Sequence, residues 1–124
     1  MFETMRRLLT PLTIQASFGN DALTIAEAGS RPGTVPFQPV AIPYREHPQV
    51  FEHPRYLVAD TEQGAVLIRK AIYEMAKGRF PLIAPEIVVR VERSLPGGMA
   101  GSDRKMLEEM FTKAGARKVV WKNV

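Results

Sequence analysis

Apolar and polar residues alternate over residues 12–17, and the alternation resumes over residues 23–25. A period of two places successive side chains on opposite faces of a strand. Between the two stretches, residues 19–21 read Gly-Asn-Asp, which favours a tight reversal of the chain. We therefore predict a hairpin, followed by a third extended segment over residues 35–44. Its three prolines should restrict it to an edge of the sheet.

The apolar spacing becomes helical over residues 61–77. Asp60 is a suitable N-cap, Gln63 stands where a capping box needs it, and Gly78 ends the pattern. A proline-bearing loop over residues 45–55 and a short extended stretch over residues 56–59 should precede this helix. Its buried stripe is expected to consist of Ala65, Leu67, Ile68, Ala71, Ile72 and Met75.

The remaining chain predicts a strand, a helix and a final strand. Residues 87–91 are mostly β-branched, which is typical of a central strand covered on both faces. A glycine-rich loop precedes a helix over residues 102–114, and residues 119–121 form the last strand. The order βββ-α-β-α-β predicts an α/β fold, a mixed sheet with helices packed on it, as in the ribonuclease H-like architecture of actin-type ATPases, nucleases and integrases. The core stripe of the second helix should be Met106, Leu107, Met110, Phe111 and Ala114, with Gly115 after it.

Four stretches carry a family resemblance through their order and spacing: residues 12–29, 39–42, 53–60 and 103–119. The last one contains a helix that ends in Ala-Gly-Ala-Arg. Together they cover most of the chain, and they resemble the first subdomain of MreB, the bacterial actin-like, rod shape-determining protein. The resemblance implies an actin-like fold and a role linked to MreB filaments or the cell-shape machinery.

Within this resemblance the first phosphate loop is degenerate. The family has an aspartate and, three residues later, a threonine, where this chain has Gln15 and Phe18. A neutral amide cannot supply an anionic ligand to Mg²⁺. Asn123 and Val124 stand where the family has two glutamates implicated in water activation. We therefore expect no ATPase activity and no cofactor, and a protein-interaction module that binds MreB filaments or a second copy of itself. The degenerate loop comprises Gln15, Ser17, Phe18, Gly19 and Asn20.

Composition predicts one cytoplasmic domain over residues 11–124, preceded by a short amphipathic segment over residues 1–10. The sequence has 124 residues, of which 45% are hydrophobic and 24% charged, and it has no cysteine. The N-terminal segment resembles the helix by which some MreB proteins touch the inner membrane. It predicts weak contact with that membrane, with packing on the domain's own sheet as the alternative. The residues concerned are Phe2, Met5, Arg6, Arg7 and Leu8.

The sequence contains only weak signals for nucleic-acid binding, nuclease activity, metal binding and anion binding. The formal net charge of +4 comes from scattered basic residues, so a nucleic-acid-binding module on a ribonuclease H-like scaffold is the alternative function. Residues 12–18 lack the acid that a two-metal nuclease would need. The repeated Glu-His-Pro at residues 46–48 and 52–54 indicates a solvated loop, and we predict no metal site. Gly97, Gly98, Gly101 and Ser102 are candidates for weak anion binding at a helix N-terminus.

Overall fold

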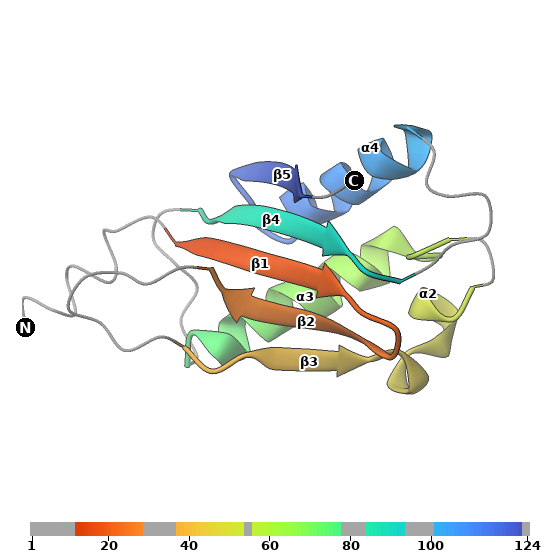
Figure 1. Ribbon diagram of the computed structural model, residues 1–124, viewed down its shortest axis with the longest axis horizontal. Helices are drawn as coiled ribbons and strands as arrows, with labels where there is room; N and C mark the ends of the chain where they lie inside the picture. The colour runs from red at the N-terminus through yellow and green to blue at the C-terminus, as the bar shows by residue number, and fades with distance from the viewer. Residues whose placement is uncertain (1–11, 29–36, 54–55, 78–83, 94–100, 123–124) are drawn as a thin grey trace, which may run out of the picture.

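The computed structural model describes residues 12–28, 37–53, 56–77, 84–93 and 101–122. Their order confirms the predicted succession of three strands, helix, strand, helix and strand (Figure 1). The strands are β1 (Thr13–Phe18), β2 (Ala22–Glu27), β3 (Val40–Pro43), β4 (Glu86–Val91) and β5 (Lys118–Lys122). The long helices are α3 (Thr61–Met75) and α4 (Gly101–Lys113).

The sheet is mixed, with five strands in the order β3-β2-β1-β4-β5. The hairpin strands pair antiparallel, and β3 continues that pattern at one edge. By contrast, β4 is parallel to both β1 and β5, because α3 returns the chain to the starting end of the sheet before β4 and α4 returns it again before β5. The carboxyl ends of β1 and β4 therefore lie together, beside the turn that joins β1 to β2 (Figure 1).

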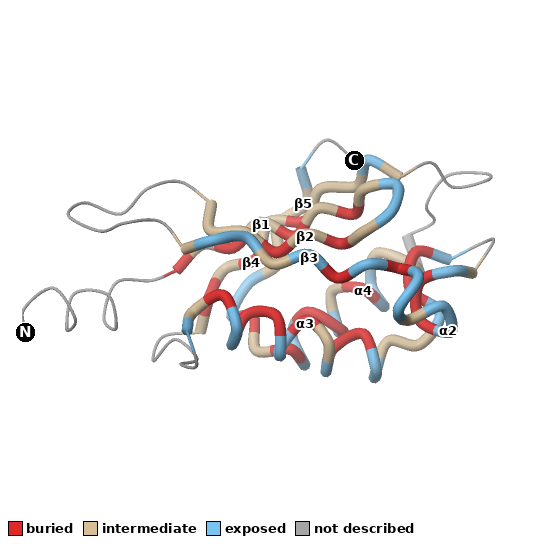
Figure 2. Tube along the Cα trace, turned by 90° about the horizontal axis from the view of Figure 1, so that it is seen from below, coloured by how far each residue is buried: buried red, intermediate tan, exposed pale blue. Residues whose placement is uncertain are grey.

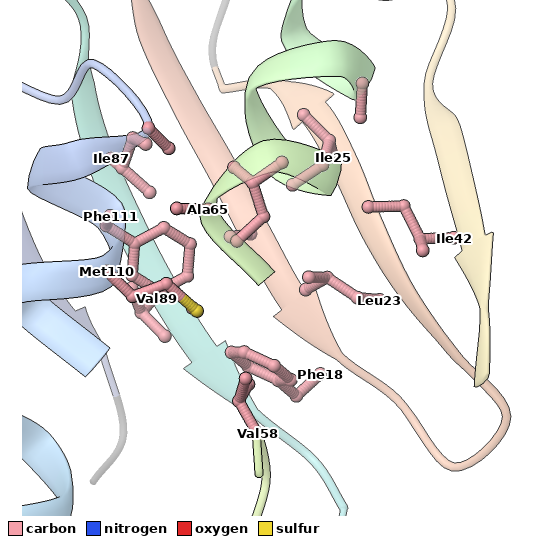
Figure 3. Close-up of a cluster of buried hydrophobic side chains, with 14 of the residues drawn as sticks. Phe18, Leu23, Ile25, Ile42, Val58, Ala65, Ile87, Val89, Met110 and Phe111 are labelled. Atoms are coloured by element: carbon pink, nitrogen blue, oxygen red, sulfur yellow. The ribbon is translucent and has the colours of Figure 1, made fainter. Parts of the chain in front are cut away.

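Both long helices lie on the same side of the sheet (Figure 2). The predicted alternation in β1 is confirmed, since Ile14, Ala16 and Phe18 point into this layer and are fully buried. Figure 3 shows their neighbours from β2, β4 and α4 converging on the same space. The rings of Phe18 and Phe111 meet edge to face with their centroids 6.3 Å apart. One apolar layer between sheet and helices thus forms the core.

The start of α3 and the end of α4 follow the predicted chemistry, whereas α3 ends at Met75 instead of Lys77, and Gly78 lies outside the described residues. The Asp60 carboxylate accepts a hydrogen bond from the Gln63 backbone N–H at 3.1 Å, which confirms Asp60 as the N-cap of α3. Gly115, just past α4, has φ of 112°, a conformation that favours glycine. In the predicted α3 stripe Leu67 is half-buried, and the members that are buried are Ala65, Ile68, Ala71, Ile72 and Met75.

The connection between β3 and α3 is more ordered than predicted. Residues 45–55 were expected to form a loop, but a 3₁₀ turn, η1 (Tyr44–Glu46), and a short helix, α2 (Pro48–Phe51), lie there. Proline suits the first turn of a helix, so Pro48 begins α2 instead of breaking it. Val50 and Phe51 are buried, and this burial fixes the segment on the core. Residues 56–59 contain no strand, and β3 begins at Val40.

The expected core stripe of α4 is wrong at one position. Met106 is 46% exposed, whereas Leu107, Met110, Phe111 and Ala114 are buried. Successive helix residues point about 100° apart, so the stripe centred on the buried four leaves Met106 at its rim.

Candidate functional site

The turn between β1 and β2 is the part of the predicted phosphate loop that reaches the end of the sheet. The Gly19 N–H donates to the Ala22 carbonyl at 3.0 Å, which closes the turn. The Gly19 carbonyl accepts a hydrogen bond from the Tyr44 hydroxyl at 2.8 Å. A Cβ at Gly19 would lie 3.2 Å from the Ala22 oxygen, so the backbone is closely packed here. Asn20 is exposed at the tip. The turn is therefore held by its own backbone and by Tyr44.

The other predicted loop residues point elsewhere. Gln15 and Ser17 lie on the sheet face away from the helices, and the Gln15 amide donates to the Ser17 hydroxyl at 3.0 Å. Phe18 points to the opposite face and is fully buried in the core. The structure thus divides the five residues among an outer sheet face, the core and the turn. It does not gather them into one constellation.

A cleft of about 750 Å³ opens beside the turn. Arg93 enters it just past the end of β4, and its guanidinium donates to the Phe51 carbonyl at 2.7 Å. The same guanidinium lies 4.9 Å from the centroid of the Tyr44 ring. The Arg93 backbone N–H also donates to the Phe18 carbonyl at 3.0 Å, which ties the end of β4 to the end of β1. The cleft is lined by Asn20, Asp21, Pro43, Tyr44, Arg45, Glu52, His53 and Arg93.

The charges in this cleft are mixed. Arg45 and Arg93 are opposed by Asp21 and Glu52, so the lining does not select strongly for an anion. Among the described residues that line the cleft there is no serine, threonine or cysteine. In the described ranges no three His, Asp or Glu residues come together as a possible metal site. The described lining of the cleft is therefore of mixed charge, and its Tyr44 side chain helps to hold the turn.

Two side chains that organise this end of the sheet, Tyr44 and Arg93, were not predicted as site residues from the sequence. Tyr44 was assigned to the end of an extended segment, yet it begins η1 and its side chain is buried. Arg93 had a usable signal, because residues just beyond the carboxyl ends of parallel strands commonly face the ligand side of such sheets. Arg93 is also bonded to the Phe51 carbonyl at the end of α2, a helix that was not predicted.

Tyr44 provides a test of this packing through its titration. Burial raises the pKa of Tyr44 to about 12, although the nearby Arg93 guanidinium acts in the opposite direction. The neutral phenol is therefore favoured by folding, and this stabilisation is complete below the unfolded pKa of about 10 and lost as the pH rises through the folded value. We expect a phenolate absorbance step near pH 12 that disappears in Tyr44→Phe. Identical titrations of the folded variant and the parent would contradict the burial of this phenol.

The other predicted sites lie partly outside the described residues. The membrane-contact candidates Phe2, Met5, Arg6, Arg7 and Leu8 lie outside the described residues, as do Gly97 and Gly98. Gly101 and Ser102 form the start of α4, and their anion binding stays a prediction. In the repeated Glu-His-Pro segments, the His47 ring lies edge-on to Phe51 and the His53 ring lies 4.8 Å from that of Tyr56.

The sheet face opposite the helices is uncovered in the part of the chain that the structure describes (Figure 2). Strand β4 was predicted to be covered on both faces; the described residues cover it on the helix side, and Val88 on the outer face is half-buried. A β-branched run shows that a strand is central but does not show that a second layer covers it. On the outer face, small or β-branched side chains surround Gln15, with the charged Glu86 and Arg90 on either side of Val88 in β4. The small or β-branched ones are Ser17, Thr24, Ala26, Ala41, Val88 and Val120.

Together, the mixed sheet, its strand order and the helices packed on one face define an actin-like, ribonuclease H-like fold. A solved structure of MreB5 of Spiroplasma citri, bound to ADP, is similar over 91% of this chain, with a TM-score of 0.55. The sequence identity is 15%, so the similarity shows the fold alone. This chain spans 38% of the length of MreB5. No protein-family model and no curated protein matches the sequence.

No helix in the described part of the chain is long and apolar enough to cross a bilayer.

Proposed function

We propose that this chain is a non-catalytic actin-like module that acts by binding another protein through the outer face of its sheet. The observation that carries the proposal is the absence, in the described ranges, of any element over that face. Around Gln15 this face presents the short side chains of Ser17, Ala26 and Val88, bordered by the charged side chains of Glu86 and Arg90, so a partner would meet a small-residue centre with charge at its rim. The fold similarity to MreB5 and the sequence resemblance favour an MreB filament as the partner.

The geometry of the β1 end supports a role without ATP hydrolysis. The Gln15 amide is neutral and already bonded to Ser17, and Phe18 is buried in the core. Neither residue is placed to bind a phosphate-bound Mg²⁺. We expect phosphate release from Mg²⁺-ATP to stay at the rate of buffer when the chain is added. Turnover that copurifies with the chain and is lost in Asn20→Ala would show instead that the turn still serves a nucleotide.

Filament binding is tested by co-sedimentation with polymerised MreB from the organism that encodes this chain, alongside anionic liposomes. We expect saturable pelleting that requires filaments and exceeds the weak pelleting with liposomes alone that membrane contact of the N-terminal segment would give. A folded chain that stays in the supernatant in both arms would contradict a filament partner. Pelleting with liposomes alone would indicate the membrane contact predicted for the N-terminal segment. The other partner that the outer face could take is a second copy, and light scattering would then give a dimeric mass.

A further inference from the structure

The two edges of the sheet differ in their capacity to accept another strand. The β3 edge is four residues long and contains Pro43, which has no N–H to donate to a neighbouring strand. The β5 edge runs from Lys118 to Lys122 without proline. In the described ranges, β5 makes its ladder with β4, and no other backbone hydrogen bond to it occurs. An additional strand therefore fits at β5 and not at β3.

Strand β5 is held firmly from the helix side. The Trp121 indole N–H donates to the Glu108 carboxylate of α4 at 2.7 Å. The Arg104 guanidinium lies 5.6 Å from the centroid of the same indole ring. Val119 packs partly on the core beside Trp121. A partner strand would meet an edge that is already ordered, so its binding would not have to order β5 as well.

The charges along β5 restrict which strand can pair there. Lys118, Val120 and Lys122 lie on the outer face, with both lysines exposed and roughly 13 Å apart along an extended chain. Neither lysine forms an ion pair with a described residue. The carboxylate opposite Lys118, that of Glu86, lies 3.9 Å from Arg117. The lysine charges are therefore available to a partner.

Pairing between two copies of β5 is disfavoured by the same lysines. An antiparallel pair centred on Val120 would place Lys118 of one copy opposite Lys122 of the other, and like charges directly opposite destabilise a sheet. Lysine on an edge strand is a common protection against such self-pairing. A strand with carboxylates four residues apart on either side of an apolar residue has the complementary pattern. Because Lys118 and Lys122 are spaced symmetrically about Val120, the two carboxylates of such a strand can face the two lysines whether the strand pairs parallel or antiparallel to β5.

We propose that the β5 edge binds an extended acidic segment of a partner protein by adding it to the sheet as a sixth strand beyond the five described. This inference rests on the proposed role in protein binding and specifies the chemistry of the partner. The backbone edge supplies the hydrogen bonds, and Lys118 and Lys122 select for acidic residues. A nucleic acid would use the two lysines but would leave the row of backbone donors and acceptors without strand partners.

Fluorescence anisotropy with two labelled peptides tests this proposal. One contains Glu-Thr-Val-Thr-Glu and the other contains Lys-Thr-Val-Thr-Lys in the same flanking sequence. We expect the acidic peptide to bind at least about tenfold more tightly than the basic one. The double variant Lys118→Glu, Lys122→Glu should reverse this preference, since both lysines are exposed and the fold does not depend on them. Hydrogen exchange should show new protection of the β5 amides by the acidic peptide.

Equal binding of the two peptides, or an unchanged preference in the double variant, would overturn the proposal. Tighter binding of a single-stranded oligonucleotide at the same lysines would overturn it in favour of a nucleic-acid surface. The filament assay separates this inference from the proposed function. If the double variant pellets with filaments as the parent does and no charge preference exists, protein binding stands and the acidic segment is wrong. If the charge reversal holds but the chain does not pellet, the filament partner is wrong.

Discussion

Replacing Phe18 with alanine is expected to destabilise the protein by about 3–5 kcal/mol, the usual cost of removing a buried phenylalanine. Phe18 is fully buried, and its ring meets that of Phe111 edge to face. The substitution therefore removes a large apolar area, leaves a cavity between the sheet and α4, and loses an aromatic contact. The free energy of unfolding from urea titrations followed by circular dichroism measures the effect.

Asn20→Ala is the matched control, since Asn20 is exposed two residues away in the same turn. We expect its effect to stay within about 0.5 kcal/mol. A cost below about 1 kcal/mol for Phe18→Ala would place Phe18 outside the core and reopen the phosphate loop as a site. Because the expected cost is large, replacing Phe18 with a small residue such as the family's threonine should also destabilise the protein.

The second large effect is expected at Gly64, where α3 passes close to α4. A Cβ added there would lie 2.7 Å from the Met110 sulfur and 3.1 Å from a methyl group of Val58. Leucine cannot fit this space without separating the helices, so we expect Gly64→Leu to cost about 3 kcal/mol. Gly64→Ala should be far milder, because the end of Met110 can rotate away and alanine favours the helix by about 1 kcal/mol.

A double-mutant cycle shows whether Met110 is the obstacle. Met110→Ala alone removes a buried side chain and should cost about 2–5 kcal/mol. Combined with Gly64→Leu, the total should be smaller than the sum, because the leucine occupies the space that the methionine leaves. Val66→Leu, at a position of α3 that is 59% exposed, serves as the neutral control. Strict additivity of the two changes would contradict the contact between Gly64 and Met110.

Much of the fold could be predicted from the sequence because its local signals agree with the packing. The alternation in β1 gives the buried face directly, since a strand has a period of two. Asp60 and Gly115 mark helix ends through backbone chemistry that does not depend on distant contacts. These features are local, so the sequence determines them without knowledge of the tertiary structure.

Features that depend on distant contacts could not be predicted. The cleft exists because Tyr44 bonds to Gly19 and Arg93 bonds to Phe51, pairs that are separated by 25 and 42 residues along the chain. The sequence of β4 did not indicate that the described residues leave its outer face uncovered. A β-branched strand has the same composition whether one or two layers cover it. Of the candidate site, the sequence indicated the position of the turn but not the separation of Gln15, Phe18 and Asn20 onto different surfaces.

The measurement that tests the central claim most directly is filament co-sedimentation of the parent chain against two arginine variants. Ala26→Arg places a long charged side chain on the outer face opposite Gln15, and Val66→Arg places the same side chain on the exposed side of α3. If the outer face binds the partner, the parent and Val66→Arg pellet alike and Ala26→Arg binds at least about tenfold more weakly. If folded Ala26→Arg pellets as well as the parent does, the outer face is not the binding surface.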